Sequence, residues 1–205
     1  MSSTTTFALI RHGQTDWNAA LRIQGHSDIP LNATGRGQAA DAVSHLAAHE
    51  WDFVVSSPLS RAAETADLIA EGLGLTVAGR IPEMVERDYG PAEGLSAGPE
   101  LDALRVPGGP TGIGGFRGAE TEASVALRGV EALQLLARDH PGARIIVVSH
   151  GTLIRLTLMQ ALDQPVDTIR NASLNVLAHT PSGWSLEILN GRPVAIGADL
   201  LPSAT

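Results

Sequence analysis

The sequence predicts an α/β fold in which helices cover a mostly parallel sheet. Three short apolar runs, at 7–10, 53–55 and 145–148, are unbroken rather than alternating, which is typical of strands buried on both faces of a parallel sheet. Segments with helical periodicity separate these runs, and the alternation of strand and helix favours a doubly wound arrangement. With 205 residues and 43% hydrophobic content, the chain has the size and apolar surface of a single domain over 1–205.

Four segments between and after these strands have the pattern of amphipathic helices. Apolar residues recur at intervals of three and four over 35–50, 60–73 and 120–139. A further helical run, 152–162, follows the third strand and precedes Pro165, which cannot continue a helix. The sequence therefore places a helix after each of the three strands.

The last third of the chain ends in a predicted hairpin. Two alternating stretches, 174–178 and 184–189, enclose a Pro-Ser-Gly turn, and we interpret them as paired strands at the sheet edge. Upstream, the composition of 91–118 shifts to Gly and Pro, which predicts little regular structure and either a mobile loop or a lid over a site. Its GGPTGIGG run lacks the G-x-G-x-x-G spacing of a dinucleotide loop and contains Pro110.

Composition excludes several classes of function. All 14 basic residues are Arg, and the absence of Lys excludes Schiff-base chemistry and a Walker lysine. The absence of Cys excludes disulfides and thiolate nucleophiles. A formal charge of −8 without a long basic run argues against nucleic-acid and membrane partners. Because there is no signal-peptide pattern and no apolar stretch near the ~20 residues of a membrane span, we expect a cytoplasmic protein.

Two strands end in the same unusual way. The first runs into Arg11-His12-Gly13, and the third runs into Ser149-His150-Gly151. The carboxyl ends of parallel strands border the ligand crevice of an open sheet, and Gly allows the backbone to approach a ligand closely. A single His at a strand end is usually structural, but two in matching contexts favour a functional site.

The second strand leads to an arginine in an unfavourable place. Arg61 follows Ser-Ser-Pro-Leu-Ser and falls in the first turn of the next helix, where the helix dipole repels a cation. One explanation is an ion pair with Glu64 or Asp67. The other is an anion that both Arg61 and the free N–H groups of the helix bind. With Arg11 at a similar strand end, two guanidinium and two imidazole groups would suit a phosphate dianion.

These residues could perform phosphoryl transfer without a metal. Neutral imidazole is a competent nucleophile near pH 7, and flanking Arg would balance the charge of the transferring phosphoryl group. The leaving oxygen also needs a proton from a carboxyl group. The acidic candidates outside predicted helices are Glu83, Glu86, Asp88 and Glu93.

Five blocks resemble the successive signatures of the histidine phosphatase superfamily, in its phosphoglycerate mutase-like branch. In order, the blocks are RHGQTDWN at 11–18, RIQG at 22–25, SSPLSRAAETA at 56–66, MVERDYGPAEG at 84–94 and VVSHG at 147–151. The resemblance implies a three-layer α/β/α sandwich with a phosphoglycerate mutase-like fold.

The resemblance also implies roles for individual residues. His12 would be the phosphorylated nucleophile, with Arg11, Arg61 and His150 as the phosphate pocket. Glu86 would be the proton donor, because the family motif places the acid four residues before a Gly. The residues that resemble contacts to substrate are Asn18, Gln24, Gly25, Arg87 and Gly151. No metal and no cofactor are expected.

A phosphatase is favoured over a cofactor-dependent phosphoglycerate mutase. The stretch after Glu86 lacks the Lys that mutases carry, so that only Arg87, Arg105 and Arg117 remain to hold a second anionic group. We therefore expect hydrolysis of a small phosphorylated metabolite. Two other hypotheses, a non-catalytic phosphoryl-binding relative and a metal-dependent phosphoesterase, fit the strand-end residues less well. The sequence leaves the substrate open, and also whether the chain is a monomer or a homodimer.

Overall fold

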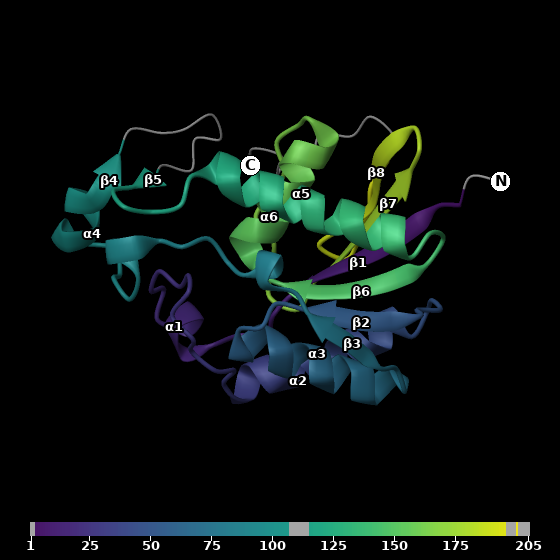
Figure 1. Ribbon diagram of the computed structural model, residues 1–205. Helices are drawn as coiled ribbons and strands as arrows, with labels where there is room; N and C mark the ends of the chain where they lie inside the picture. Colours follow the sequence, from purple (N-terminus) through teal and green to yellow (C-terminus); the bar gives the residue numbers. More distant parts are fainter. Residues whose placement is uncertain (1–2, 107–114, 196–199, 201–205) are drawn as a thin grey trace.

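The computed structural model describes residues 3–106, 115–195 and 200. Within these residues, a seven-stranded sheet has the order β3-β2-β6-β1-β7-β8-β9 (Figure 1). Its strands are β1 (Thr5–Arg11), β2 (Phe53–Ser56), β3 (Val77–Arg80), β6 (Arg144–Ser149), β7 (Leu174–Thr180), β8 (Gly183–Leu189) and β9 (Arg192–Pro193).

The sheet is mixed, with a parallel half that carries the first three predicted strands. Strands β3, β2, β6 and β1 pair in parallel, whereas β7, β8 and β9 are antiparallel. The predicted hairpin is confirmed as β7 and β8. Its first strand is not at the edge, however, because β7 also pairs with β1, and β9 adds a further strand beyond β8.

Helices cover both faces of the sheet, as the sequence predicts. Helices α2 (Ala33–Leu46) and α3 (Ser60–Leu73) lie on one face, and α5 (Glu122–Asp139) and α6 (Gly151–Leu162) lie on the other (Figure 1). The result is an α/β/α sandwich. The predicted helix 35–50 is shifted, because the Asn32 side chain accepts from the Gly35 N–H and begins α2 two residues earlier.

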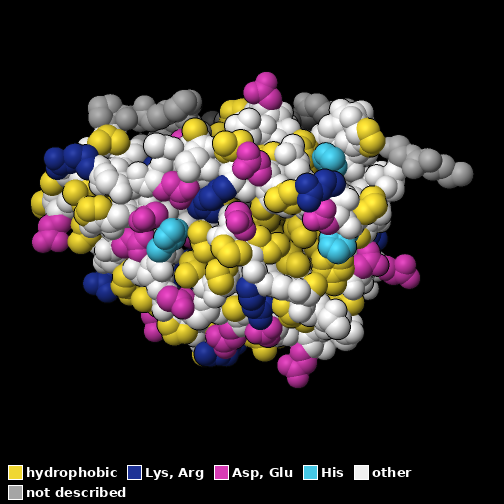
Figure 2. Space-filling model, in the orientation of Figure 1, with side chains coloured by type: hydrophobic (Ala, Val, Ile, Leu, Met, Phe, Trp, Pro, Cys, Tyr) yellow, Lys and Arg dark blue, Asp and Glu magenta, His cyan; other side chains and the backbone are white. Residues whose placement is uncertain are grey.

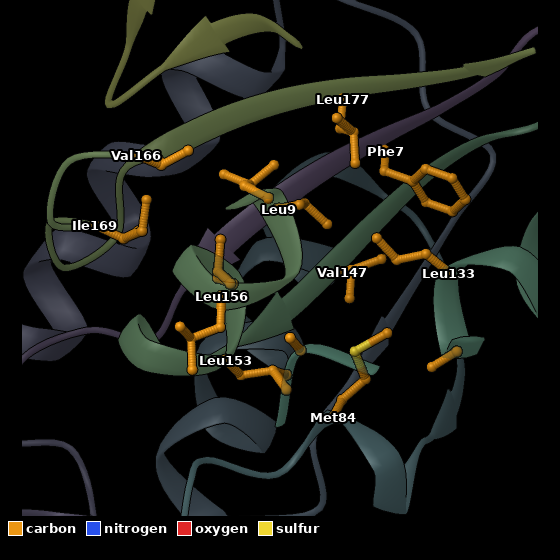
Figure 3. Close-up of a cluster of buried hydrophobic side chains, with 14 of the residues drawn as sticks. Phe7, Leu9, Met84, Leu133, Val147, Leu153, Leu156, Val166, Ile169 and Leu177 are labelled. Carbon is orange, nitrogen blue, oxygen red and sulfur yellow. The ribbon is translucent and has the colours of Figure 1, made fainter. Parts of the chain in front are cut away.

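The central strands are unbroken apolar runs because each faces two hydrophobic cores. In β1, Phe7 and Leu9 belong to the core beneath α5 and α6, while Ala8 and Ile10 belong to the core above α2 and α3. Figure 3 shows Phe7 and Leu9 of β1 and Leu177 of β7 in the first of these cores, to which Leu153 and Leu156 of α6 also belong. The parallel register of β1, β6 and β2 brings their carboxyl ends to one level, where the site residues follow.

The segment 91–118 contains more regular structure than predicted. Helix α4 (Pro99–Leu104) begins with Pro at its first position, which is favourable there. Strands β4 (Arg105–Val106) and β5 (Gly115–Phe116) pair in antiparallel fashion. Most of the GGPTGIGG run lies outside the described residues, so the lid stays a prediction. Sequence analysis also missed α1 (Asp16–Ala19), β3, β9 and two 3-10 turns, η1 (Pro82–Met84) and η2 (Gly90–Ala92), all of which are short.

Charged side chains are dispersed over the visible surface. On the face shown in Figure 2, Arg and acidic side chains are interspersed rather than gathered into a single basic patch. Across 3–106, 115–195 and 200, the structure has no helix with both the length and the apolar character needed to cross a membrane.

Candidate active site

Three parallel strands deliver the predicted site residues to one edge of the sheet. Arg11 ends β1 opposite Ser149 at the end of β6, and the His12 N–H donates to the Ser149 carbonyl at 2.9 Å. Beyond β2, the Ser57 N–H donates to the Val148 carbonyl at 2.9 Å. The chain therefore leaves the three strands at the same level and brings side chains from distant sequence blocks together.

The hydrogen bonds of His12 define which ring nitrogen is free to react. Its Nδ1 lies 2.7 Å from the Gly13 carbonyl, which can only accept, so Nδ1 carries the proton. Nε2 therefore holds the lone pair, and it accepts from Arg61 Nε at 3.2 Å. The side chain is 3% exposed, and burial together with Arg61 and Arg11 holds the pKa of His12 well below its ordinary value. A buried, neutral imidazole with a defined lone pair is a nucleophile.

Arg61 is fully buried and oriented by backbone carbonyls. It is 0% exposed, and its Nη1 and Nη2 donate to the carbonyls of Ser27 (3.0 Å) and Gly25 (2.8 Å). Burial lowers the pKa of Arg61 to about 10, which still leaves the guanidinium charged at neutral pH. The alternative ion pair with Glu64 or Asp67 is not formed, because Glu64 pairs with Arg36 and Asp67 pairs with Arg80 instead. The positive charge of Arg61 is therefore not paired with either carboxylate, and it lies beside His12.

His150 and Arg11 complete the cluster around His12, and each has a buried nitrogen to spare. The His12 and His150 rings lie 5.2 Å apart, and His150 Nε2 is 2.8 Å from Ser57 Oγ. His150 Nδ1 and Arg11 Nε are buried and have no hydrogen-bond partner among the described residues. Arg11 Nη1 donates to the Ile169 carbonyl at 2.8 Å. Buried polar atoms without partners are unfavourable unless a ligand satisfies them, and an oxyanion would accept from the Arg11 Nε–H.

Glu86 lies at the N-terminus of α6, next to this cluster. One carboxylate oxygen accepts from the N–H groups of Arg87 and Leu153, both at 2.9 Å, and the other accepts from Thr152 at 3.1 Å. Glu86 is 6% exposed, whereas Glu83 lies on the exposed surface of η1. Of these two acids, only Glu86 is positioned at the site, because free N–H groups at the start of α6 orient its carboxyl oxygens.

Arg128 of α5 supports the segment that carries Glu86. Its guanidinium donates to the carbonyls of Glu83 (2.7 Å), Val85 (2.6 Å) and Glu86 (3.0 Å). It also forms two 3.0 Å hydrogen bonds with the Glu120 carboxylate. Sequence analysis missed this residue, because a single Arg on a helix carries no signal of a contact 42 or more positions away.

A close approach explains the glycine after His150. A Cβ on Gly151 would lie 3.2 Å from Arg11 Nε and 3.3 Å from Arg11 Cζ. Because such a contact is tight, any larger residue would push against the Arg11 guanidinium. Gly151 therefore allows α6 to begin beside Arg11.

The other predicted substrate contacts do not all face the site. Asn18 and Gln24 face the site: Asn18 Nδ2 donates to Gln24 Oε1 at 3.1 Å, and the buried Gln24 Nε2 has no partner among the described residues. Gly25 contributes the carbonyl that orients Arg61. Arg87 is directed elsewhere, since its Nε donates to the Glu120 carbonyl at 2.8 Å and its Nη1 pairs with Glu122.

A pocket of about 210 Å³ opens beside Arg11 and Glu86. Two arginines that sequence analysis did not consider, Arg22 and Arg155, line it. The pocket therefore offers two cations besides Arg87, Arg105 and Arg117, the residues that the sequence indicates for a second anionic group. Those three lie in the stretch after Glu86, whereas Arg155 lies four residues beyond Gly151 and so on the same face of α6. The remaining lining residues are Asn18, Ile23, Gln24, Tyr89, Gly151, Thr152, Thr168 and Ile169.

Within the described ranges, no three His, Asp or Glu side chains are grouped as metal ligands. Comparison with known proteins then identifies the family. The model of the histidine phosphatase superfamily (branch 1) matches residues 7–192. The chain belongs to the histidine phosphatase superfamily.

Known histidine phosphatases and related proteins are similar over almost their whole length. The chain is 34% identical to the "Uncharacterized phosphatase PhoE" of Bacillus subtilis, with 91% of this chain and 94% of that protein covered. It is 33% identical to the "Probable phosphoglycerate mutase GpmB" of Serratia proteamaculans, with 86% of each covered. Among solved structures, a phosphoserine phosphatase mutant from Entamoeba histolytica, in complex with phosphoserine, aligns with a TM-score of 0.77 at 26% identity. The alignment covers 91% of this chain and 96% of that one.

The family assignment accounts for both the fold and the sequence blocks. The predicted superfamily, the α/β/α sandwich and an enzyme of the histidine phosphatase type are confirmed. The five blocks converge at the carboxyl edge of the parallel strands, as an active site in an open α/β sheet should. Their individual chemical roles belong to the proposal that follows.

Proposed function

We propose that this histidine phosphatase hydrolyses a small phosphomonoester through a phosphohistidine on His12. The observation that carries the proposal is the buried His12 Nε2, whose lone pair faces Arg61 Nε at 3.2 Å and is flanked by Arg11 and His150. A single hydrogen bond, from Nδ1 to the Gly13 carbonyl, holds the ring in the reactive tautomer. Nucleophile and charge-balancing groups are therefore preorganised before substrate binds.

The reaction has two steps. In the first, His12 Nε2 forms a bond to phosphorus while the bond to the ester oxygen breaks, and Glu86 transfers a proton to the leaving oxygen. In the second, water forms a bond to phosphorus while the N–P bond breaks, and Glu86 accepts a proton from that water. Inorganic phosphate leaves, the imidazole is neutral again and Glu86 is ready to donate once more.

The cationic groups supply the electrostatic part of catalysis. Charge develops on the equatorial oxygens of the transferring phosphoryl group, and donors fixed in a buried site stabilise it. Arg61 and Arg11 provide guanidinium N–H groups, and the unpartnered His150 Nδ1 and Arg11 Nε provide further polar contacts. We propose that these groups act without a metal or cofactor.

We treat 1–205 as one domain with hydrolysis as its main activity. The match of a single family model over 7–192 supports one domain, and the similarity to the Bacillus subtilis phosphatase supports hydrolysis. A phosphoglycerate mutase is the second candidate, because Arg22 and Arg155 line the pocket and could retain a second anionic group. With 3-phosphoglycerate and 2,3-bisphosphoglycerate supplied together, we expect release of phosphate to exceed isomerisation. Isomerisation tenfold faster than hydrolysis would reverse this order.

Rapid quenching tests the covalent step. Labelled phosphomonoester mixed with the enzyme should give an acid-labile, alkali-stable phosphoprotein, because phosphohistidine has that stability pattern. The label should be absent in His12→Asn and present in His45→Asn, a matched control on the exposed surface of α2. Label on Ser or Asp would refute the proposed nucleophile.

A further inference from the structure

Glu93, one of the four acidic candidates that the sequence indicates, has no part in the mechanism above. It follows η2, is half-buried and is not among the residues that line the pocket. Its carboxylate nevertheless accepts four hydrogen bonds. Oε1 accepts from the N–H groups of His26 (2.7 Å) and Tyr89 (3.3 Å), and Oε2 accepts from the N–H and the hydroxyl of Ser27 (2.7 and 2.5 Å). The position of this carboxylate is therefore fixed.

The residues that donate to Glu93 are also those whose backbone orients Arg61. The Gly25 carbonyl and the His26 N–H belong to one planar peptide group and point in opposite directions. Arg61 Nη2 donates to that carbonyl at 2.8 Å, and Glu93 Oε1 accepts from that N–H at 2.7 Å. Ser27 likewise directs its N–H to Glu93 Oε2 and its carbonyl to Arg61 Nη1, at 2.7 and 3.0 Å. These three residues therefore lie between the guanidinium and the carboxylate and contact both.

The charges on the two sides strengthen the hydrogen bonds between them. A carboxylate that accepts from an N–H polarises the peptide group, which makes the carbonyl at its other end a better acceptor for a guanidinium. Burial acts to raise the pKa of Glu93, but the hydrogen bonds from Ser27, His26 and Tyr89 outweigh it and hold the pKa below its ordinary value. Glu93 is therefore ionised at neutral pH, opposite the charged Arg61.

The absence of a side chain at position 25 allows this close approach. A Cβ on Gly25 would overlap Glu93 Oε1 and the Arg87 carbonyl. Any larger residue would therefore force the carboxylate away from the peptide group that faces Arg61.

Two other contacts limit how far residues 25–27 can move. The Ile23 N–H donates to the Leu95 carbonyl at 2.8 Å and joins the two chain segments through their backbones. Beyond Ser27, the Asp28 carboxylate accepts from the Ser60 N–H at 2.7 Å, at the start of α3. Because neither contact involves the Glu93 side chain, removal of its charge should loosen these residues without detaching them.

From this arrangement, and resting on the proposed phosphatase activity, we propose that Glu93 is a positioning residue that holds Arg61 against His12 through residues 25–27. It neither contacts the phosphoryl group nor transfers a proton. Its carboxylate fixes the peptide groups, their carbonyls fix the guanidinium, and the guanidinium meets the phosphoryl oxygens. Loss of the Glu93 charge therefore weakens the binding of any phosphoryl group at His12, whatever its leaving group.

Glu93→Gln tests the role of the charge, because it keeps the length of the side chain and replaces one oxygen by an NH2 group that faces N–H donors. We expect kcat/KM to fall about tenfold. Glu64→Gln is the matched control, since Glu64 is also half-buried, lies one turn after Arg61 on α3 and pairs with Arg36 instead. It should remain within about twofold of the unmodified enzyme.

Two leaving groups distinguish an effect on Arg61 from an effect on Glu86. Propyl phosphate and p-nitrophenyl phosphate share the oxygens that Arg61 contacts, so Glu93→Gln should lower kcat/KM equally for both. The alternative route is through His26, whose Nε2 lies 2.9 Å from the Glu86 carbonyl. A loss confined to propyl phosphate would show that Glu93 acts on the proton donor, and would overturn the proposal.

A double-mutant cycle distinguishes positioning from a general structural role. In an Arg61→Lys background, Glu93→Gln should cost less than about twofold, because the group that it positions is already gone. Ser27→Ala removes only the hydroxyl donor to Glu93, leaves the backbone contacts and should show the same non-additivity with a smaller loss. Urea unfolding checks that each variant is folded. An undiminished tenfold loss in the Arg61→Lys background would refute the positioning role.

Binding of inorganic phosphate separates this proposal from the proposed function, because it needs Arg61 but no turnover. Calorimetry should give a Kd about tenfold higher for Glu93→Gln than for the unmodified enzyme, and an unchanged Kd for Glu64→Gln. If that difference is found in an enzyme that hydrolyses no phosphomonoester, the hydrolase function fails and the positioning role stands. Equal affinities of the unmodified enzyme and Glu93→Gln, or no binding by either, would refute the role of Glu93 even if hydrolysis occurs.

Discussion

The two buried histidines should make the fold less stable at mildly acidic pH. Burial lowers the pKa of both His12 (3% exposed) and His150 (0% exposed) well below the ordinary value of 6.5, with Arg61 and Arg11 adding to the effect. In the unfolded chain both side chains titrate normally. Between pH 6.5 and the lower folded-state pKa values, the unfolded state therefore binds more protons, and stability falls as pH falls. Above pH 6.5 the stability is fully present.

The size of the effect follows from linkage. Consider a histidine that has a pKa of about 6.5 in the unfolded chain and stays neutral when folded. Protonation then increases the population of the unfolded state by the factor 1 + 10^(pKa − pH), which is roughly 1.1 at pH 7.5 and roughly 11 at pH 5.5, an increase of about tenfold. Each histidine that stays neutral then contributes between about 1 and 2 kcal/mol of lost stability, and the two together contribute about 3 kcal/mol. This interval lies above the titration of most carboxylates, which isolates the histidine contribution.

Urea unfolding at pH 7.5 and 5.5 measures this loss directly. The single variants His12→Asn and His150→Asn should each reduce the pH-dependent loss by about half, which is between about 1 and 2 kcal/mol, whatever they do to stability at pH 7.5. His45→Asn is the matched control, because His45 is exposed to water and its removal should leave the loss near the unmodified value. If both buried-site variants lose as much stability as the unmodified protein, the histidines are not neutral in the fold and the reasoning is refuted.

Three further predictions concern the catalytic cluster and the segment that carries Glu86. Arg61→Lys should lower kcat/KM by about 100-fold or more, since the single nitrogen of an ammonium cannot replace the three guanidinium nitrogens that reach His12 and two backbone carbonyls. Steady-state kinetics should show Arg36→Lys, in an exposed ion pair, within about twofold of the unmodified enzyme, and a similar value for Arg61→Lys would contradict its role. Glu86→Gln should slow hydrolysis of an alkyl phosphate by about 100-fold but that of p-nitrophenyl phosphate by less than about tenfold, because nitrophenolate needs little protonation. Arg128→Met should shift this substrate ratio in the same direction by a smaller factor, since it removes the donors to the segment carrying Glu86, and an equal loss on both substrates would indicate a purely structural role.

Most of the secondary structure could be predicted because it depends on local patterns. The run over 145–148 is apolar at every position since alternate side chains enter opposite cores, and helix 60–73 has the bounds that its periodicity predicts. Strand β3 and helix α4 were missed because each is too short for periodicity to show.

The site residues, too, fall into those that local sequence patterns predict and those that long-range contacts place. The sequence by itself determined that His12 and His150 stand at strand ends, because the carboxyl ends of parallel strands meet at one edge of a sheet. Only the tertiary structure decided that Arg61 Nε contacts His12 Nε2, and that Arg22 and Arg155 line one pocket while Arg87 is directed away from it. The physical reason is range: strand and helix patterns depend on neighbours within a few residues, whereas the direction of an arginine is set by carbonyls and carboxylates from distant segments.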